Sequence, residues 1–173
     1  MIYLIGVDHY LQHDGNESAK PELRSAFKNF LKNEITALGV DVIAEEFNED
    51  AIRWSMASHS TLGRLAEELR ITHLYCEPTI QERKELEIPS YGQIKKTLGL
   101  SPTIPIEEEI RMVSEKQKEY FAPRENFWLN KLTPFLSDTV LFVLGSKHMD
   151  SFSSLLEQKA IDYVRRVEYW TNK

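Results

Sequence analysis

Two short motifs of the form G-x-x-H stand near opposite ends of the chain, at residues 6–9 and 145–148. They place His9 and His148 directly after strongly apolar runs. A neutral histidine is a competent general base near neutral pH. Either motif alone recurs by chance, but the two together, each at the end of an apolar run, indicate one shared polar site.

Carboxylates follow two further apolar runs, at Glu45, Glu46 and Glu77. A carboxylate beside a histidine can fix its tautomer and stabilise its protonated form. We therefore predict catalytic roles for Glu45 and Glu46 beside the histidines, and substrate binding or support for Glu77. The alternative for Glu77, which Pro78 follows, is a simple turn.

The remaining charged residues of the two motifs are Asp8 and Lys147. We place both in substrate binding or in support of the histidines, although Asp8 could equally start a turn. Two histidines and a carboxylate can also hold a divalent metal with open positions for water. If a metal such as Mn, Co or Zn is bound, the predicted ligands are His9, His148 and Glu46.

The elements that must position these residues follow from the apolar periodicity. It predicts strands at residues 2–7, 40–45, 71–76, 139–144 and 163–168. Helices are expected at 20–38, 48–57, 61–70, 106–121 and 151–159, with a further one after Pro123. Residues 87–105 hold three prolines and two glycines and are expected to form a loop or lid.

Helices that alternate with short apolar strands predict an α/β fold, with a mostly parallel central sheet flanked by helices on both faces. The length of 173 residues fits a single domain spanning 1–173. Ligands of such sheets bind outside the carboxyl ends of the strands, where the strands just described deliver their ionisable residues.

Composition narrows the function classes. The formal net charge is −6 and the basic residues cluster only in pairs, so nucleic-acid binding is not expected. No apolar run approaches the ~20 residues that span a bilayer, and no signal peptide is evident. A lone cysteine, Cys76, excludes an internal disulfide, and we expect a cytoplasmic protein.

Other catalytic signatures are absent from the sequence. There is no glycine-rich phosphate loop, no G-x-S-x-G nucleophile elbow and no H-E-x-x-H helix. A metallophosphoesterase would need G-D-x-x-D and G-N-H-E motifs, which are also missing. Cys76 as a nucleophile is weakened by its position in a strand, where a small buried residue is typical.

The order of the motifs resembles one superfamily, which joins TraB/PrgY proteins, Tiki proteases, ChaN haem-binding proteins and erythromycin esterases. The segments that carry this resemblance are residues 2–9, 42–46, 123–126 and 140–148. It implies a shared pocket formed by His9, Glu45 or Glu46, Arg124 and His148. Family members differ in chemistry: Tiki-like members are metal-dependent proteases, whereas the esterases use histidine as a base without metal.

Two departures limit what the resemblance implies. Val7 stands where the first motif often carries threonine or glutamate, which weakens transfer of the esterase mechanism. The chain is also short for the superfamily. Arg124, permanently charged, is expected either to steady a developing oxyanion or to form a salt bridge to a strand-end glutamate.

These observations favour a hydrolase of an ester, lactone or amide bond, with or without a divalent metal. The alternative is a non-catalytic protein that binds a small molecule or peptide signal in the same cleft. A purely structural role, with the histidines far apart, is a further reading. The sequence leaves the substrate open, and equally the oligomeric state, for which a homo-oligomer is allowed.

Overall fold

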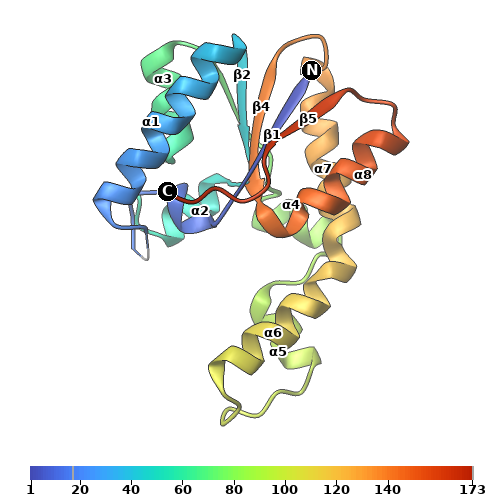
Figure 1. Cartoon of the computed structure of the whole chain (residues 1–173). Coiled ribbons are helices and arrows are strands. Elements are labelled where there is room, and N and C mark those ends of the chain that lie inside the picture. Colours follow the sequence, from blue (N-terminus) through green and yellow to red (C-terminus); the bar gives the residue numbers. More distant parts are fainter. Residues whose placement is uncertain (17, 173) are drawn as a thin grey trace.

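The computed structural model describes residues 1–16 and 18–172, and these form an α/β fold around a five-stranded parallel sheet (Figure 1). The strand order is β3–β2–β4–β1–β5. The strands are β1 (Ile2–Val7), β2 (Val42–Glu45), β3 (Thr72–Tyr75), β4 (Val140–Gly145) and β5 (Tyr163–Val167). The predicted fold class is therefore confirmed, and all five predicted strands are present with small shifts at their ends.

The sheet order explains why residues far apart in sequence meet. β4 lies between β1 and β2, with Val7 opposite Gly145 and Glu45 opposite Val143. All six residues of β4 are buried, as expected for a central strand covered on both faces. The two G-x-x-H motifs and the Glu45–Glu46 pair consequently end on adjacent strands at one edge of the sheet.

Helices cover both faces of the sheet, as Figure 1 shows. On one face α1 (Pro21–Leu38) and α3 (Thr61–Leu69) pack in one apolar cluster, and on the other α7 (Phe121–Leu132) and α8 (Met149–Gln158) pack in a second. The short helix α2 (Glu49–Trp54) follows β2.

Side chains of the central strands alternate between these two clusters. Leu141 and Val143 point toward α1 and α3, whereas Phe142 and Leu144 point toward α7 and α8. β2 follows the same two-residue period. Because of that period, consecutive residues at the end of β2 point to opposite faces of the sheet. Glu45 and Glu46 therefore have different surroundings, which are described below.

Three further helices lie at the carboxyl end of the sheet: α4 (Ile80–Glu85), α5 (Tyr91–Thr97) and α6 (Ile106–Gln117). α5, α6 and the segment between them project away from the sheet (Figure 1), and we call residues 91–117 the arm. The prediction of a loop over 87–105 was therefore partly wrong. The first turn of α5 is fixed by a reciprocal cap between Ser90 and Gln93, a pattern that promotes helix formation.

The arm continues into the body of the protein. After α6 the chain forms a single 3₁₀ turn, η2 (Lys118–Tyr120), and enters α7 at once. Pro123 lies in the first turn of α7, where a missing N–H is tolerated. The helix predicted over 106–121 thus ends at Gln117, and the helix predicted to follow Pro123 begins two residues before it.

The segment after β5 crosses the end of β1. The Trp170 amide donates a hydrogen bond of 2.8 Å to the Gly6 carbonyl. A Cβ atom on Gly6 would lie 2.0 Å from the Glu168 carbonyl oxygen, so this crossing requires glycine in the first motif. In the part of the chain that the structure describes, no helix is both long and apolar enough to cross a bilayer.

Candidate active site

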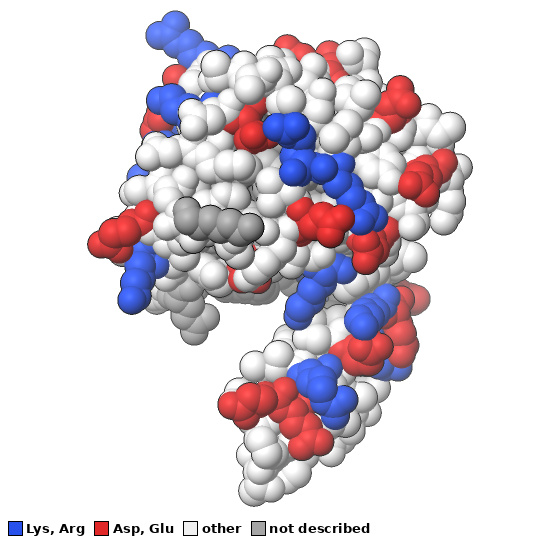
Figure 2. Space-filling view, viewed as in Figure 1, with Lys and Arg blue, Asp and Glu red and all other residues white. Residues whose placement is uncertain are grey.

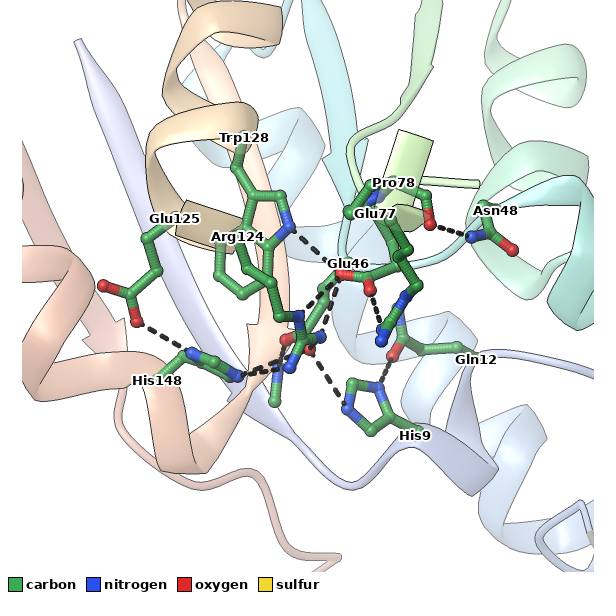
Figure 3. A network of polar contacts seen from close by, with 12 residues as sticks. His9, Gln12, Glu46, Asn48, Glu77, Pro78, Arg124, Glu125, Trp128 and His148 are labelled. Atoms are coloured by element: carbon green, nitrogen blue, oxygen red, sulfur yellow. Dashed lines mark hydrogen bonds and ion pairs between the residues drawn. The ribbon is translucent and has the colours of Figure 1, made fainter. Parts of the chain in front are cut away.

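The structure brings His9, Glu46, Arg124 and His148 together at the carboxyl ends of β1, β2 and β4 (Figure 3). Glu46 stands at the centre. Its Oε1 accepts a hydrogen bond of 2.6 Å from Arg124 Nη2 and lies 3.5 Å from His9 Nε2 and 3.6 Å from His148 Nε2. Four of the predicted site residues therefore share one small cluster.

The carboxylate of Glu46 is buried and held in its ionised form. Burial by itself would raise the pKa of Glu46, but the positive charges that His148, His9 and Arg124 can carry outweigh it. A hydrogen bond of 2.7 Å from the Gly145 amide to Oε2 acts in the same direction. The resulting pKa is lowered from 4.5 to about 2, so Glu46 is an anion at neutral pH.

Gly145, the glycine of the second motif, permits this close approach. A Cβ atom there would lie 2.8 Å from His9 Nε2 and 3.1 Å from Glu46 Oε2. Contacts that short would push the imidazole of His9 and the carboxylate of Glu46 away from residue 145. Both motif glycines are thus explained by contacts, Gly6 by the crossing backbone and Gly145 by the site itself.

His9 lies in the 3₁₀ turn η1 (His9–Leu11) and faces the solvent, with its side chain 51% exposed. Its Nδ1 is 2.7 Å from Gln12 Oε1, and Gln12 Nε2 donates to Glu45 Oε2 at 3.1 Å. Because the amide oxygen only accepts, Nδ1 carries the proton. The lone pair of the neutral ring is then on Nε2, toward Glu46.

Glu45, for which a catalytic role was predicted beside Glu46, does not line the pocket. It is fully buried on the α3 side of the sheet, because its neighbour Glu46 takes the opposite face. Glu45 Oε1 accepts from the Ser60 hydroxyl and lies 2.7 Å from His73 Nε2. Glu45 therefore acts on His9 only through Gln12.

His148 is the buried counterpart, with a side chain only 5% exposed. Its Nδ1 is 2.8 Å from Glu125 Oε1, and its Nε2 is 3.1 Å from Arg124 Nη1. Since arginine can only donate, Nε2 must accept and Nδ1 carries the proton. The rings of Phe121 and Trp128 pack against the imidazole. Both nitrogens of His148 are thus already engaged.

Arg124 links the cluster to Glu77. Its Nε and Nη2 donate to Glu77 Oε2 at 3.3 and 2.8 Å, while Arg83 holds the other carboxylate oxygen. Trp128 Nε1 also donates to Glu77 Oε2, at 3.1 Å. Burial alone would lower the pKa of Arg124, but these carboxylates raise it further above its ordinary value. One N–H on Nη1 has no acceptor among the described residues.

The predicted metal ligands do not form a metal site in this arrangement. Arg124 occupies the positions a cation would need, because its guanidinium contacts both His148 Nε2 and Glu46 Oε1. Across residues 1–16 and 18–172, no group of three or more histidine, cysteine, aspartate or glutamate side chains has a geometry that could hold a metal.

The two other predicted residues lie at the edge of the site. Asp8 accepts a hydrogen bond of 2.6 Å from the Tyr169 hydroxyl, so Gln12, and not Asp8, orients His9. Lys147 is exposed and its Nζ lies 3.3 Å from Ser114 Oγ on α6. Both line the pocket without touching the histidines through any hydrogen bond in the described chain.

A pocket of about 830 Å³ opens in front of this cluster. Its walls come from the strand ends, α2, α4 and the arm, and it includes His9, Glu46, Arg124 and His148. Pockets for small molecules commonly occupy ~300–1,000 Å³. Cys76 lies outside it, and burial raises the pKa of its thiol, so it is not a candidate nucleophile.

Sequence reasoning did not find Gln12, Ser60, His73 and Glu125, the residues that hold the histidines and Glu45. Their partners lie 3 to 33 residues away. Only the position of Gln12, three residues after His9 in one turn, offered a local signal.

No family model, curated protein or solved structure matches the chain.

Proposed function

We propose that this protein is a metal-free hydrolase of an ester, lactone or amide bond, with His9 as the general base. The observation that carries the proposal is the state of His9: Gln12 fixes the proton on Nδ1, the side chain is half exposed and lines the pocket, and the unprotonated Nε2 lies 3.5 Å from Glu46. A base needs a lone pair that solvent and substrate can reach.

The neighbours of His9 suit that role. As Nε2 takes a proton from water, the imidazolium gains the ionised Glu46 at 3.5 Å as a counter-charge. The unpartnered N–H of Arg124, a pocket-lining residue, is the group we assign to the oxyanion that develops at the substrate carbonyl. His148 completes the arrangement by holding Arg124 through Nη1.

We also propose membership of the superfamily of TraB/PrgY, Tiki, ChaN and erythromycin esterase proteins. Support comes from the convergence of both motif histidines on one strand-end glutamate, beside an arginine from the helix that precedes the last motif strand. Within that group the metal-independent mechanism fits these residues better, since Arg124 fills the cation position. The single cysteine supports a cytoplasmic localisation, where the environment is reducing.

The test is hydrolysis of a panel of esters, lactones and N-acyl compounds by the wild type and by His9→Ala. We expect His9→Ala to lower kcat/KM by about 10²–10⁴-fold. His59→Ala is the matched control, because His59 is exposed and lies outside this pocket. Equal turnover by the wild type and His9→Ala would remove His9 from the chemistry.

A binding protein without turnover is the second candidate. It is favoured by one observation: Glu46, Glu77 and Arg124 already satisfy one another without any bound molecule. A small molecule or peptide would then occupy the pocket in front of a static cluster. Saturable binding by the wild type with no hydrolysis of any panel member would favour this reading.

A further inference from the structure

The outer part of the pocket is lined by large apolar side chains that are exposed to solvent. Trp54 on α2 is 71% exposed, and Ile80 on α4 and Tyr91 on the arm are also exposed. Exposed aromatic and aliphatic groups that face a common hollow are unfavourable unless something covers them. They indicate that part of the ligand is apolar.

The charges of the same pocket are unequally satisfied. Its buried carboxylates are paired, Glu46 and Glu77 with Arg124, and Asp50 with Arg53. Asp8, which also lines the pocket, accepts a hydrogen bond from the Tyr169 hydroxyl and forms no ion pair among the described residues. Lys84 on α4 and Lys147 after β4 line the pocket, and neither forms an ion pair within the part of the chain that the structure describes. Figure 2 shows basic side chains where the arm joins the body.

We infer that the substrate is an apolar acyl group joined through an ester or amide bond to a unit that carries a free carboxylate, as in an N-acyl amino acid. The inference rests on the proposed hydrolase function. The acyl chain would pack against Trp54, Ile80 and Tyr91, and the carboxylate would pair with Lys84 and Lys147. Uncompensated lysines in a pocket favour an anionic ligand group.

The reaction on such a substrate balances without any co-reactant except water. The oxygen of water forms a bond to the acyl carbon, and His9 Nε2 takes one proton of that water. The bond between the acyl carbon and the nitrogen or oxygen of the leaving group then breaks. His9 returns the proton to the leaving group, so that a fatty-acid-like carboxylic acid and an amino acid or hydroxy acid are released. The carboxylic acid then loses the second proton of the water to the solvent, or to the released amine, and becomes a carboxylate.

The inference is tested by binding, measured calorimetrically on His9→Ala so that turnover does not interfere. The probes share one octanoyl chain: N-octanoylglycine, N-octanoylglycinamide and the mono-octanoyl amide of ethylenediamine. We expect the carboxylate to bind roughly tenfold more tightly than the neutral amide and the ammonium compound to bind most weakly.

Variants locate that preference. In the same background, Lys147→Met and Lys84→Met should each weaken binding of N-octanoylglycine by about fivefold and leave the neutral amide unchanged. Lys147→Glu should shift the preference toward the ammonium probe. The matched control is Lys96→Met, since Lys96 is an exposed arm lysine outside the pocket with no ion pair in the described chain.

A separate experiment tests the apolar side chains that line the outer part of the pocket. Trp54→Ser should weaken binding of N-octanoylglycine by about tenfold and leave N-acetylglycine unchanged. Equal affinity for all three octanoyl probes, or a preference that survives both lysine substitutions, would overturn the assigned substrate class. That result differs from a failure of the proposed function, which would appear as wild-type protein that binds N-octanoylglycine selectively and never cleaves it.

Discussion

The two G-x-x-H segments share a pattern and differ in what surrounds their histidines. His9 sits half exposed on a short turn, held by one hydrogen bond from Nδ1 to Gln12. His148 is buried between aromatic rings, with Glu125 on one nitrogen and Arg124 on the other. The first motif thus supplies a half-exposed imidazole with an unprotonated Nε2, whereas the second supplies a buried imidazole that holds Arg124.

Removal of each histidine in turn, followed by measurement of unfolding, tests whether the two have different roles. His148→Ala should cost about 3 kcal/mol, because it leaves Glu125 and Arg124 with buried groups unpaired and opens a cavity beside Trp128. His9→Ala should cost about 1 kcal/mol or less, since water reaches the vacated site. Chemical denaturation distinguishes them, and equal losses would contradict the division of roles.

Acid should act through the carboxylate that both histidines face. The pKa of Glu46 is about 2 in the folded protein and 4.5 ordinarily, so its stabilising effect is complete above pH 4.5 and is lost as pH falls toward 2. The difference corresponds to about 3 kcal/mol. Denaturation at pH 6 and pH 3 should show a steeper loss in the wild type than in Glu46→Gln, and parallel losses would exclude this linkage.

Substitution of the two motif glycines should lower stability by different amounts. Gly6→Ala places a Cβ against the backbone oxygen of Glu168, which cannot rotate away, and should destabilise by about 2–3 kcal/mol. Gly145→Ala meets the His9 ring, which can turn outward, and should cost about 1 kcal/mol while impairing turnover. Gly92→Ala, with open space around it in α5, serves as the control. Thermal unfolding ranks the three.

The smallest expected effect concerns the support of His9. Gln12→Leu removes the acceptor at Nδ1 and leaves both ring tautomers accessible. We expect kcat to fall by about tenfold with little change in KM. Gln12→Asn, measured in parallel, tests whether the length of the side chain matters. Its shorter amide should not reach His9 Nδ1 and should not restore the hydrogen bond. An unaltered kcat in Gln12→Leu would show that the orientation of His9 does not depend on this residue.

Much of the fold followed from local patterns. The runs that became β1, β2 and β4 are short and apolar, as expected of buried strands. β5 contains Arg165 and Arg166 and alternates between half-buried and exposed residues. Helix α5 was missed because it buries only Ile94, which leaves almost no apolar period to detect. Its Ser90–Gln93 capping pair was a signal that sequence reasoning could have used.

The site was predictable to the extent that position at a strand end reveals it. His9, Glu46 and His148 were singled out in this way, whereas Arg124, which lies on α7, was singled out only through the resemblance. Strand alternation could have excluded Glu45 from the same face. The partners Gln12 and Glu125 could not be assigned, because their hydrogen bonds depend on how η1 and α7 pack against the sheet. Local sequence carries no information on that packing.

One consequence of the passage from α6 through η2 into α7 concerns motion. Ser114 and Gln117 line the pocket from α6, and Arg124 and Glu125 follow within two turns on α7. Because η2 joins α6 to α7 without a loop, the pocket-lining end of α6 and the Arg124 end of α7 belong to one continuous helical stretch. A ligand that tilts α6 when it binds at the pocket entrance would therefore also move the Arg124 guanidinium away from Glu46. Binding at the entrance would then change the charge environment of the Glu46 carboxylate.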